Sequence, residues 1–590
     1  MTEFMTEFAI EVDRFSCRYL ENGPWVLENV SFQIRRGETV LLLGPSGCGK
    51  STLALCLKGL IPHTIAGETR GTVRIGGTYV GEEIEIWGAG IVFQDPESQL
   101  IMPRVDEEVA FGLENMAVPL SSMDERIDRA LSKCGLASYK KQLVETLSTG
   151  QMQRLALASV MAMQPSIFIF DEPTANLDPE GTEHFYQDLR ALKGSMEVTI
   201  FLIEHRIDMA LPLVDRVLLM DQNGRIAADG EPHQVFENGP TGRDRIWLPT
   251  ACRLTEMLKN GGYAVSRTPL SLDETEALFR RVFPGLQINS GVSERASISH
   301  SDPAVPRHSS VASPSASTDK VPAIAVRGVS YTYPSGQVAL DRADLHIDEG
   351  TFLALIGANG SGKSTLAKAI SGLIRPKEGQ ISLFNQPANR LRGSQFMQYI
   401  GYVFQNPEHQ FVTERVEDEL AYSLKRHYPP EDLVFRTGEL LDSFALRGFE
   451  EANPFSLSQG QKRRLSVATM VALKQPILIL DEPTFGQDPD SARLLMQHVQ
   501  RLHKQGKTIV LITHDMHLVL AYGELTAVMY RGRVIFQGTP DELFRESEIL
   551  VRASLSPPFE VQLGQRLGDP SLFTRGDWLE RLSALQSGLL

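Results

Sequence analysis

The chain of 590 residues lacks any run of about 18 uninterrupted apolar residues, so we expect no segment that spans a membrane. Its first residues are acidic and contain no apolar core of the kind found in export signals, so we expect a cytoplasmic protein. Cysteine is scarce, and no pair of cysteines has the spacing of a metal site, which predicts buried, reduced thiols. The five cysteines are Cys17, Cys48, Cys56, Cys134 and Cys252.

Positive charge is also in deficit. The chain has 58 lysines and arginines against 73 aspartates and glutamates, which gives a formal net charge of −15. This balance disfavours a protein that binds nucleic acid or anionic lipid through bulk positive charge, so any membrane contact is expected to go through a protein partner. The hydrophobic fraction of 42% and the charged fraction of 22% are ordinary for globular proteins, and the length predicts about three to five structural units.

An internal repeat organises the chain. Five short segments occur twice in the same order, and the offset between the copies drifts only from 313 to 309 residues. This small drift indicates a tandem duplication with short loop insertions or deletions. The pairs are GPSGCGKST (44–52) and GANGSGKST (357–365), VFQDPESQ (92–99) and VFQNPEHQ (403–410), LSTGQ (147–151) and LSQGQ (457–461), IFIFDEPTANLD (167–178) and ILILDEPTFGQD (477–488), and IEHR (203–206) and ITHD (512–515).

The repeat also predicts the domain boundaries. A stretch rich in serine, alanine and proline separates the copies and has too few large apolar residues to offset the entropy of ordering. We interpret it as a flexible linker, with an ordered insertion as the alternative. The predicted parts are a first repeat domain (8–245), a first helical tail (246–284), the linker (285–320), a second repeat domain (321–546) and a C-terminal tail (547–590).

Short apolar runs alternate with helical patterns in each copy. Residues 39–43 and 352–356 precede glycine-rich loops that open helices. The runs IFIF, ILIL, TIFLI and TIVLI are typical of strands that are buried on both faces. The alternation predicts an α/β fold with a parallel sheet that helices cover on both sides.

The glycine-rich segments match the pattern G-x-x-x-x-G-K-[ST]. Glycines let backbone N–H groups turn toward phosphate oxygens, and the following helix presents its positive N-terminus to the same anion. In the first copy, Lys50 adds charge for the β- and γ-phosphates and Ser51 offers a hydroxyl to Mg²⁺. The predicted phosphate-binding residues are Gly44, Pro45, Ser46, Gly47, Cys48, Gly49, Lys50, Ser51 and Thr52, and in the second copy Gly357, Ala358, Asn359, Gly360, Ser361, Gly362, Lys363, Ser364 and Thr365.

Acidic pairs follow the apolar runs IFIF and ILIL, at the end of a strand where ligand sites gather in open α/β sheets. Asp171 and Asp481 are predicted to hold hydrated Mg²⁺. Glu172 and Glu482 follow directly and are predicted to polarise the water that attacks the γ-phosphate.

Histidine and glutamine recur near these acids. His205 and His514 follow a further buried run, and their recurrence favours a contact with the γ-phosphate over simple packing in the core. Gln94 and Gln405 follow another predicted strand and are candidates for reaching Mg²⁺ or the attacking water; taken alone, they are ordinary loop amides.

The segments LSTGQ and LSQGQ precede helical patterns. Ser148 and Ser458 lie where the hydroxyl of a helix N-cap is expected. The alternative interpretation is a second anion site, at which the helix N-terminus closes over a nucleotide held by another subunit or domain. From the residues alone both interpretations stay open.

Together, these segments resemble the ATP-binding cassette ATPases over residues 10–245 and 322–545, with Walker A, Q-loop, signature, Walker B, D-loop and H-loop in order in both copies. The resemblance implies two P-loop nucleotide-binding domains in tandem, each with a helical signature subdomain, that hydrolyse ATP. It also implies head-to-tail packing, in which each ATP lies between one Walker A loop and the other signature, and adenine stacking by Tyr19 and Tyr333. One implied site combines Lys50, Gln94, Asp171, Glu172 and His205 with Ser458, Gly460 and Gln461, and the other combines Lys363, Gln405, Asp481, Glu482 and His514 with Ser148, Gly150 and Gln151.

The chain departs from the family pattern at three positions. Thr149 and Gln459 replace the middle glycine of the signature, and Gln487 stands where the second D-loop usually has an apolar residue. The serine and the glycine that contact phosphate remain. We therefore expect both sites to bind and hydrolyse ATP, without implying equal rates.

Within this family, the segments DPESQ (95–99) and NPEHQ (406–410) are similar to those of energy-coupling factor importers of vitamins and metals, as are VDEEVAFGLEN (105–115) and VEDELAYSL (416–424). That resemblance implies a peripheral motor at the cytoplasmic face of the membrane. Its partners would be a transmembrane coupling protein, docked in grooves after Gln94 and Gln405, and a membrane substrate-binding subunit. Vitamins, thiamine precursors and cobalt or nickel all stay open as cargo.

Three other classes of ATPase are alternatives. A tandem ATPase acting on ribosomes should have a long, basic, helical linker, whereas this one is neutral and broken by prolines. A DNA-repair or chromosome ATPase is disfavoured by the acidic balance and the absence of zinc or coiled-coil inserts. The ATPase of another importer class, such as a sugar importer, stays possible, although such tandem chains commonly have a degenerate second phosphate loop.

Overall fold

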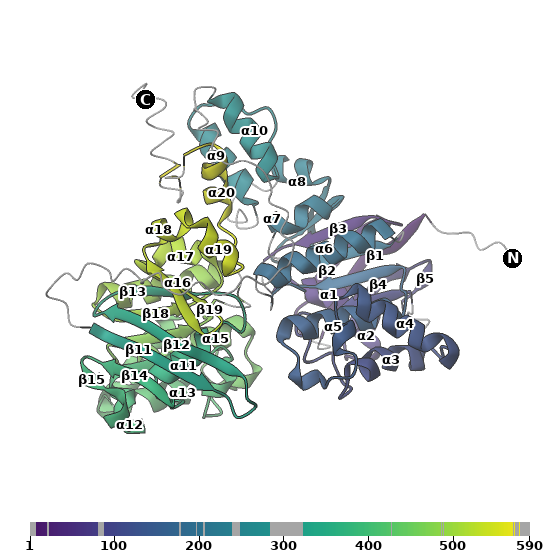
Figure 1. Cartoon of the computed structure of the whole chain (residues 1–590). Helices are drawn as coiled ribbons and strands as arrows, with labels where there is room; N and C mark the ends of the chain where they lie inside the picture. The colour runs from purple at the N-terminus through teal and green to yellow at the C-terminus, as the bar shows by residue number, and fades with distance from the viewer. Residues whose placement is uncertain are drawn as a thin grey trace. The chain divides into compact units, whose positions relative to one another are not determined.

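The structure is a computed structural model (Figure 1). The chain divides into two compact units, Met1–Leu278 and Phe279–Leu590, and each is described by itself. The predicted linker at 285–320 lies outside the described residues. The structure describes residues 7–19, 23–45, 47–80, 88–175, 177, 179–195, 198–204, 207–238, 248–283, 322–425, 427–484, 487, 489–569, 572 and 577–578.

The first unit is built on a six-stranded sheet with the order β10-β9-β3-β8-β7-β6, in which only β10 runs antiparallel to its neighbour. Every residue of β3, β7 and β8 is buried, as expected for parallel strands that are covered on both faces. The strands are β3 (Thr39–Leu43), β6 (Ala89–Val92), β7 (Ile167–Asp171), β8 (Thr199–Ile203), β9 (Arg216–Met220) and β10 (Ile226–Gly230).

The strand β7 shows how the sequence fills both faces. Phe168 and Phe170 pack into one hydrophobic cluster, and Ile167 and Ile169 pack into the other, because successive side chains of a strand point to opposite faces. Asp171 ends the strand at its carboxyl edge. The predicted acidic residue is therefore held at the edge of the sheet where the phosphate loop after β3 also begins.

A smaller antiparallel sheet, with the order β2-β1-β4-β5, completes the strands of the first unit. The inward-facing residues of β1 and β2 join the same cluster as Ile167 and Ile169. Tyr19 directly follows β1. The strands are β1 (Phe8–Arg18), β2 (Leu27–Arg35), β4 (Glu68–Ile75) and β5 (Thr78–Tyr79).

Helices cover the first unit. The helix α1 opens directly after the phosphate loop, and α3, α4 and α5 pack together as a helical subdomain in which α5 begins at the signature segment. The helices are α1 (Lys50–Lys58), α2 (Leu60–His63), α3 (Val105–Asn115), α4 (Leu120–Lys133), α5 (Thr149–Ala162), α6 (Pro179–Ser195), α7 (Ile207–Ala210), α8 (Pro232–Asn238), α9 (Thr250–Asn260) and α10 (Leu272–Val282), with 3₁₀ turns η1 (Ala137–Tyr139), η2 (Val144–Thr146) and η3 (Leu211–Leu213).

The second unit repeats this architecture. Its main sheet has the order β16-β17-β18-β13-β19-β20, with β20 antiparallel, and its smaller sheet has the order β12-β11-β14-β15. The strands are β11 (Pro322–Thr332), β12 (Val338–Asp348), β13 (Phe352–Ile356), β14 (Glu378–Leu383), β15 (Gln386–Pro387), β16 (Ile400–Val403), β17 (Ile477–Asp481), β18 (Thr508–Ile512), β19 (Leu525–Tyr530) and β20 (Arg533–Gly538).

The helices of the second unit follow the same plan, and the described residues of both predicted tails contain helices. The α/β fold with a mostly parallel sheet in each copy is thereby confirmed. The helices are α11 (Lys363–Ile370), α12 (Gly393–Tyr399), α13 (Val416–Leu424), α14 (Pro430–Ser443), α15 (Gln459–Val471), α16 (Pro489–Lys504), α17 (Met516–Tyr522), α18 (Pro540–Arg545), α19 (Ser547–Arg552) and α20 (Phe559–Arg566), with 3₁₀ turns η5 (Ala388–Arg390), η6 (Pro407–Gln410) and η7 (Pro454–Ser456).

The cysteines and the apolar character of the helices are the last features of the fold. All five cysteines are free and buried. Across the described parts of the chain, no helix combines the length and the apolar character that a bilayer crossing needs.

Candidate functional site

The phosphate loops join the end of a central strand to the start of a helix. Gly49 and Gly362 are the N-cap residues of α1 and α11, with φ angles of 103° and 105°, and neither helix has a side-chain cap. The positive φ requires glycine here, because a side chain would be strained in this conformation. The first backbone N–H groups of each helix therefore face the loop with no capping side chain, which suits an anion.

A lysine lies at the centre of each loop and is almost fully buried. Lys50 Nζ donates to the carbonyl oxygens of Gly44 and Pro45, at 2.9 and 3.0 Å. Lys363 Nζ donates to those of Gly357 and Ala358, at 2.7 and 3.0 Å. Each ammonium group is thus held inside its loop, where a phosphate group can reach it.

The serine after each lysine contacts the acid at the end of the neighbouring buried strand. Ser51 Oγ donates to Asp171 Oδ1 at 3.1 Å, and Ser364 Oγ donates to Asp481 Oδ1 at the same distance. A hydroxyl oxygen and a carboxylate oxygen are hard donors of the kind that Mg²⁺ prefers. The predicted metal ligands from the loop and the strand are therefore brought together in both units, and their chemistry fits the ion.

The second acid of each pair has an unusual backbone. Glu172 and Glu482 both have a φ of 49°, in the left-handed region. Their N–H groups donate to the carbonyl oxygens of Ile203 and Ile512, so the backbone stays bonded to the next strand while it turns sharply. A left-handed residue other than glycine costs about 1–2 kcal/mol, and such strain gathers at functional sites.

Each of these glutamates contacts a predicted partner. In the first unit, Gln94 Nε2 donates to Glu172 Oε2 at 3.0 Å. In the second unit, His514 Nδ1 lies 3.0 Å from Glu482 Oε1, whereas the Gln405 side chain is exposed. His205 lies outside the described residues, as does Ser46.

The signature serines cap their helices, as one of the two interpretations expected. Ser148 Oγ accepts from the backbone of Gln151 at 3.3 Å, while the Gln151 side chain accepts from the backbone of Ser148 at 2.8 Å. Ser458 and Gln461 form the same reciprocal pair. Gly150 and Gly460 lie in the first turn of these helices. A capped helix N-terminus is compatible with an anion contact, which stays a prediction.

The tyrosines that were expected to contact adenine each form a hydrogen bond with the threonine that follows the phosphate-loop serine. Tyr19 Oη lies 3.0 Å from Thr52 Oγ1, and Tyr333 Oη lies 3.0 Å from Thr365 Oγ1. Tyr19 keeps 41% of its surface exposed. These hydrogen bonds fix each aromatic ring beside the start of the helix that follows the loop.

Cys48 belongs to the first phosphate loop, and the corresponding residue of the second loop is Ser361. It is 2% exposed, and burial raises the pKa of the Cys48 thiol although Lys50 acts in the opposite direction. The thiol is therefore protonated at neutral pH and packs as a small apolar group.

Two residues of the second site were missed by the sequence reasoning. Tyr402 Oη donates to Asp481 Oδ2 at 2.9 Å, and Arg463 Nη1 donates to the Phe404 carbonyl oxygen at 3.0 Å. Burial lowers the pKa of Arg463 to about 10, although the charges of Glu482 and Asp481 oppose this, so the side chain stays cationic at neutral pH. Aligning the two copies would have shown both residues as differences, because the first copy has Ile91 and Gln153 there.

A groove of about 520 Å³ opens in the first unit beside the segment that follows Gln94. It is lined mainly by apolar side chains, together with the two carboxylates of Glu97 and Glu145. The exposed fraction of Leu143 is 45%. Residues that line the groove include Glu97, Leu100, Met102, Leu143, Val144 and Met152.

Backbone hydrogen bonds connect one side of this groove to the segment that precedes the signature. The N–H of Val144 donates to the Pro103 carbonyl oxygen at 2.9 Å, and the N–H of Val105 donates to the Gln142 carbonyl oxygen at 3.1 Å. These bonds fasten the segment before Ser148 to the start of α3.

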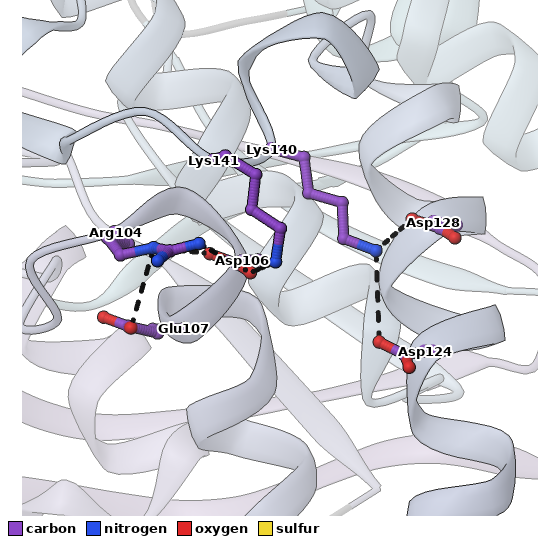
Figure 2. Close-up of polar contacts among 7 residues, drawn as sticks. All are labelled: Arg104, Asp106, Glu107, Asp124, Asp128, Lys140 and Lys141. Atoms are coloured by element: carbon purple, nitrogen blue, oxygen red, sulfur yellow. Dashed lines mark hydrogen bonds and ion pairs between the residues drawn. The ribbon is translucent and has the colours of Figure 1, made fainter.

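Ion pairs reinforce this connection (Figure 2). Lys141 Nζ lies 2.6 Å from Asp106 Oδ2, Arg104 Nε lies 3.2 Å from Asp106 Oδ1, and Lys140 Nζ lies 2.6 Å from Asp128 Oδ1. Burial alone would raise the pKa of Asp106, but the hydrogen bond from Lys141 and the charge of Arg104 lower it. Asp106 is therefore ionised throughout the neutral range.

Comparisons with known proteins give the family. The sequence profile of the family described as ABC transporter matches residues 27–175 and 340–485. The chain is 36% identical over 557 residues to the putative HMP/thiamine import ATP-binding protein YkoD of Bacillus subtilis (strain 168), covering 93% of this chain and 95% of that protein. It is also 36% identical over 569 residues to the putative ABC transporter ATP-binding protein TTE1589 of Caldanaerobacter subterraneus subsp. tengcongensis, covering 96% of this chain and 97% of that protein.

Among solved structures, cbiO1 from Clostridium perfringens, described as part of the ABC transporter complex cbiONQ, is similar over 40% of this chain and 94% of that chain, with 33% identity and a TM-score of 0.35. The chain belongs to the ABC transporter family. It is a tandem ABC transporter ATPase, with an ATP-binding domain in each half.

The strained glutamates give a first prediction. We expect Glu172→Gln and Glu482→Gln each to lower ATP turnover by about 100-fold or more and to trap ATP in one site, because an amide cannot take the proton of the attacking water. Phosphate release and retention of labelled ATP measure the two effects. Glu548→Gln, at an exposed position on α19, is the matched control. Turnover of the double variant at the level of the unaltered protein would reject the assignment of the base.

The second loop gives a prediction about stability. A Cβ at Gly357 would lie 2.3 Å from the Met529 carbonyl oxygen, whereas one at Gly360 would meet nothing within 4 Å. Both residues have positive φ, so Gly360→Ala should cost only the backbone strain, about 1 kcal/mol. Gly357→Ala should cost about 3 kcal/mol of unfolding free energy. Denaturant unfolding without nucleotide compares the two, and equal losses would contradict this account of the loop.

Proposed function

We propose that the chain is the ATP-hydrolysing motor of an importer of the energy-coupling factor type. The observation that carries the proposal is that lysine, serine, aspartate and glutamate recur in one geometry in both units, so each unit keeps a full set of predicted catalytic groups. The name of the relative YkoD favours HMP or thiamine as the cargo, among the vitamins, vitamin precursors and transition-metal ions considered.

The proposed nucleotide sites are shared between the halves. Each ATP is held by the phosphate loop of one half and the signature of the other, so that Lys50 acts with Ser458, and Lys363 acts with Ser148. The serines lie at helix N-termini, whose partial positive charge favours an anion contact. ATP binding closes the two halves and hydrolysis lets them separate, which is the motion that drives transport.

The chemistry of each site follows from its residues. The lysine binds the β- and γ-phosphates, and the glutamate accepts a proton from the water whose oxygen attacks the γ-phosphorus, while the bond to the bridging oxygen of ADP breaks. Gln94 orients Glu172, and His514 orients Glu482. Ser51, Asp171 and Gln94, or Ser364, Asp481 and Gln405, would hold Mg²⁺, which neutralises phosphate charge when bound.

The groove in the first unit is the proposed docking site of a transmembrane coupling protein. Its mainly apolar lining suits a helix, the carboxylates of Glu97 and Glu145 are among the lining residues, and its backbone is bonded to the segment before the signature. In the second unit, Val412 after Gln405 is 66% exposed, and Phe455, which packs edge-on against Phe411, is 50% exposed, which favours a second docking surface. The coupling protein would link to a membrane substrate-binding subunit, and the chain would lie at the cytoplasmic face of the membrane.

The proposed division of the chain follows the repeat, with nucleotide-binding domains at 8–245 and 321–546, tails at 246–284 and 547–590, and a flexible linker at 285–320. This arrangement requires the linker to allow the two domains to face each other. No nucleic-acid partner is part of the proposal.

Uptake is the direct test of this function. The chain is co-expressed with the integral membrane proteins encoded beside its gene, purified as a complex and reconstituted in vesicles with labelled thiamine or HMP. ATP-dependent uptake that disappears with the Glu172→Gln, Glu482→Gln double variant supports the proposal. Failure to associate with any membrane protein, together with co-sedimentation with ribosomes at moderate salt, would reject it.

The groove gives a separate prediction. Leu143→Asp places a charge on the apolar lining, and we expect it to weaken co-purification with the membrane complex about tenfold or more, because a carboxylate must be desolvated on docking. Basal ATPase activity of the chain alone should persist. Leu120→Asp is the matched control, since Leu120 is 82% exposed on α4 and does not line the groove. Equal effects of the two variants would contradict docking at this groove.

A further inference from the structure

The second nucleotide site contains a tyrosine for which the predicted catalytic set assigns no role. Tyr402 lies on β16, where it pairs in register with Ile479 of β17, two residues before Asp481. Its hydroxyl donates to Asp481 Oδ2 at 2.9 Å. Tyr402 is 7% exposed and Asp481 is 2% exposed, so the hydrogen bond is sheltered from water. A sheltered bond to a charged oxygen is stronger than one at the surface.

This bond divides the two oxygens of the carboxylate between different partners. Oδ1 accepts from Ser364 Oγ at 3.1 Å, on the side of the phosphate loop, and Oδ2 accepts from Tyr402. A carboxylate that is held at both oxygens cannot rotate freely about its last bond. Asp481 Oδ1 therefore already faces the phosphate loop, and the carboxylate needs no further rotation to contact a cation there.

The tyrosine ring is itself held in place. Phe404 packs edge-on against it, with ring centroids 4.8 Å apart, and Tyr402 belongs to the hydrophobic cluster on one face of the main sheet. The hydroxyl is thus a fixed donor, which is the property expected of a group that orients a metal ligand.

The first unit differs at this point. Ile91 occupies the corresponding place on β6, in register with Ile169, two residues before Asp171. Ser51 still donates to Asp171, so the loop side of the carboxylate is the same in both units. Whatever else Asp171 contacts, an isoleucine side chain offers it no hydrogen bond. The tyrosine hydroxyl therefore distinguishes the second site from the first.

We propose that Tyr402 is a positioning residue that orients Asp481 for the divalent cation and thereby tightens the binding of that cation at the second nucleotide site. The proposal rests on the proposed cation site at Asp481. It goes beyond that function because it assigns a difference between the two sites and the residue responsible for it.

Mn²⁺, a paramagnetic substitute for Mg²⁺, reports the binding directly. The full chain is titrated with Mn²⁺ in the presence of a non-hydrolysable ATP analogue, and free Mn²⁺ is followed by electron paramagnetic resonance. An Asp171→Asn background isolates the second site, and an Asp481→Asn background isolates the first. We expect Tyr402→Phe to raise the Mn²⁺ dissociation constant of the second site about tenfold, the low end for an outer-shell partner, and to leave the first site unchanged.

Two further variants separate positioning from packing. Tyr399→Phe removes a hydroxyl from the end of α12, in a ring that packs on Phe384, and should change neither dissociation constant. Tyr402→Ile introduces the residue of the first copy and should raise the Mn²⁺ dissociation constant of the second site as Tyr402→Phe does. A purely structural tyrosine would instead lower the unfolding temperature while the Mn²⁺ dissociation constant stayed the same, and that result overturns the inference.

The same titrations distinguish a failure of the inference from a failure of the proposed site. If Asp481→Asn leaves Mn²⁺ binding in the presence of the ATP analogue unchanged, the proposed cation site at Asp481 is wrong. If Asp481→Asn removes one equivalent of bound Mn²⁺ and Tyr402→Phe has no effect, only the role of the tyrosine is wrong.

Discussion

A carboxylate that ends a buried strand has to be paired, and this requirement organises each half of the molecule. Asp171 and Asp481 are 7% and 2% exposed, and an unpartnered charge at such depth would be very costly. In each half, the serine that follows the loop lysine donates to this acid. The bond spans the sheet, because β8 lies between β3 and β7, and β18 lies between β13 and β17. The phosphate loop and the acidic strand are thereby held in one fixed relation.

The two halves keep this frame and differ around it. The loop lysines make the same contacts in both units, and both signature serines cap their helices in the same way. The differences lie near the acids: Gln94 donates to Glu172, whereas its counterpart Gln405 is exposed. Arg463 and Tyr402 add a buried cation and a buried hydroxyl to the second site only. Duplication has thus preserved the groups that bind phosphate while their surroundings diverged.

The sequence predicted best what depends on local spacing. The glycine-rich loop, the buried strand IFIFD and the cap at Ser148 each lie within a few residues, so pattern and hydrophobic period were sufficient. The left-handed backbone of Glu172 was not predictable, because the sheet imposes it on a residue with no preference for it. Tyr402 was missed because its role depends on the pairing of β16 with β17, residues about eighty positions apart. The groove was expected only from the family resemblance, since distant segments form it.

Two residues shortly before each signature form ion pairs, and these residues are basic in the first half and acidic in the second. Lys140 and Lys141 contact acids in the first unit. The corresponding residues of the second unit are Glu450 and Glu451, which form ion pairs with Arg447 and Arg415. Exchanging these stretches between the copies would set glutamates against Asp106 and Asp128. The two short stretches are therefore not interchangeable, because each has the charge that its own neighbours require.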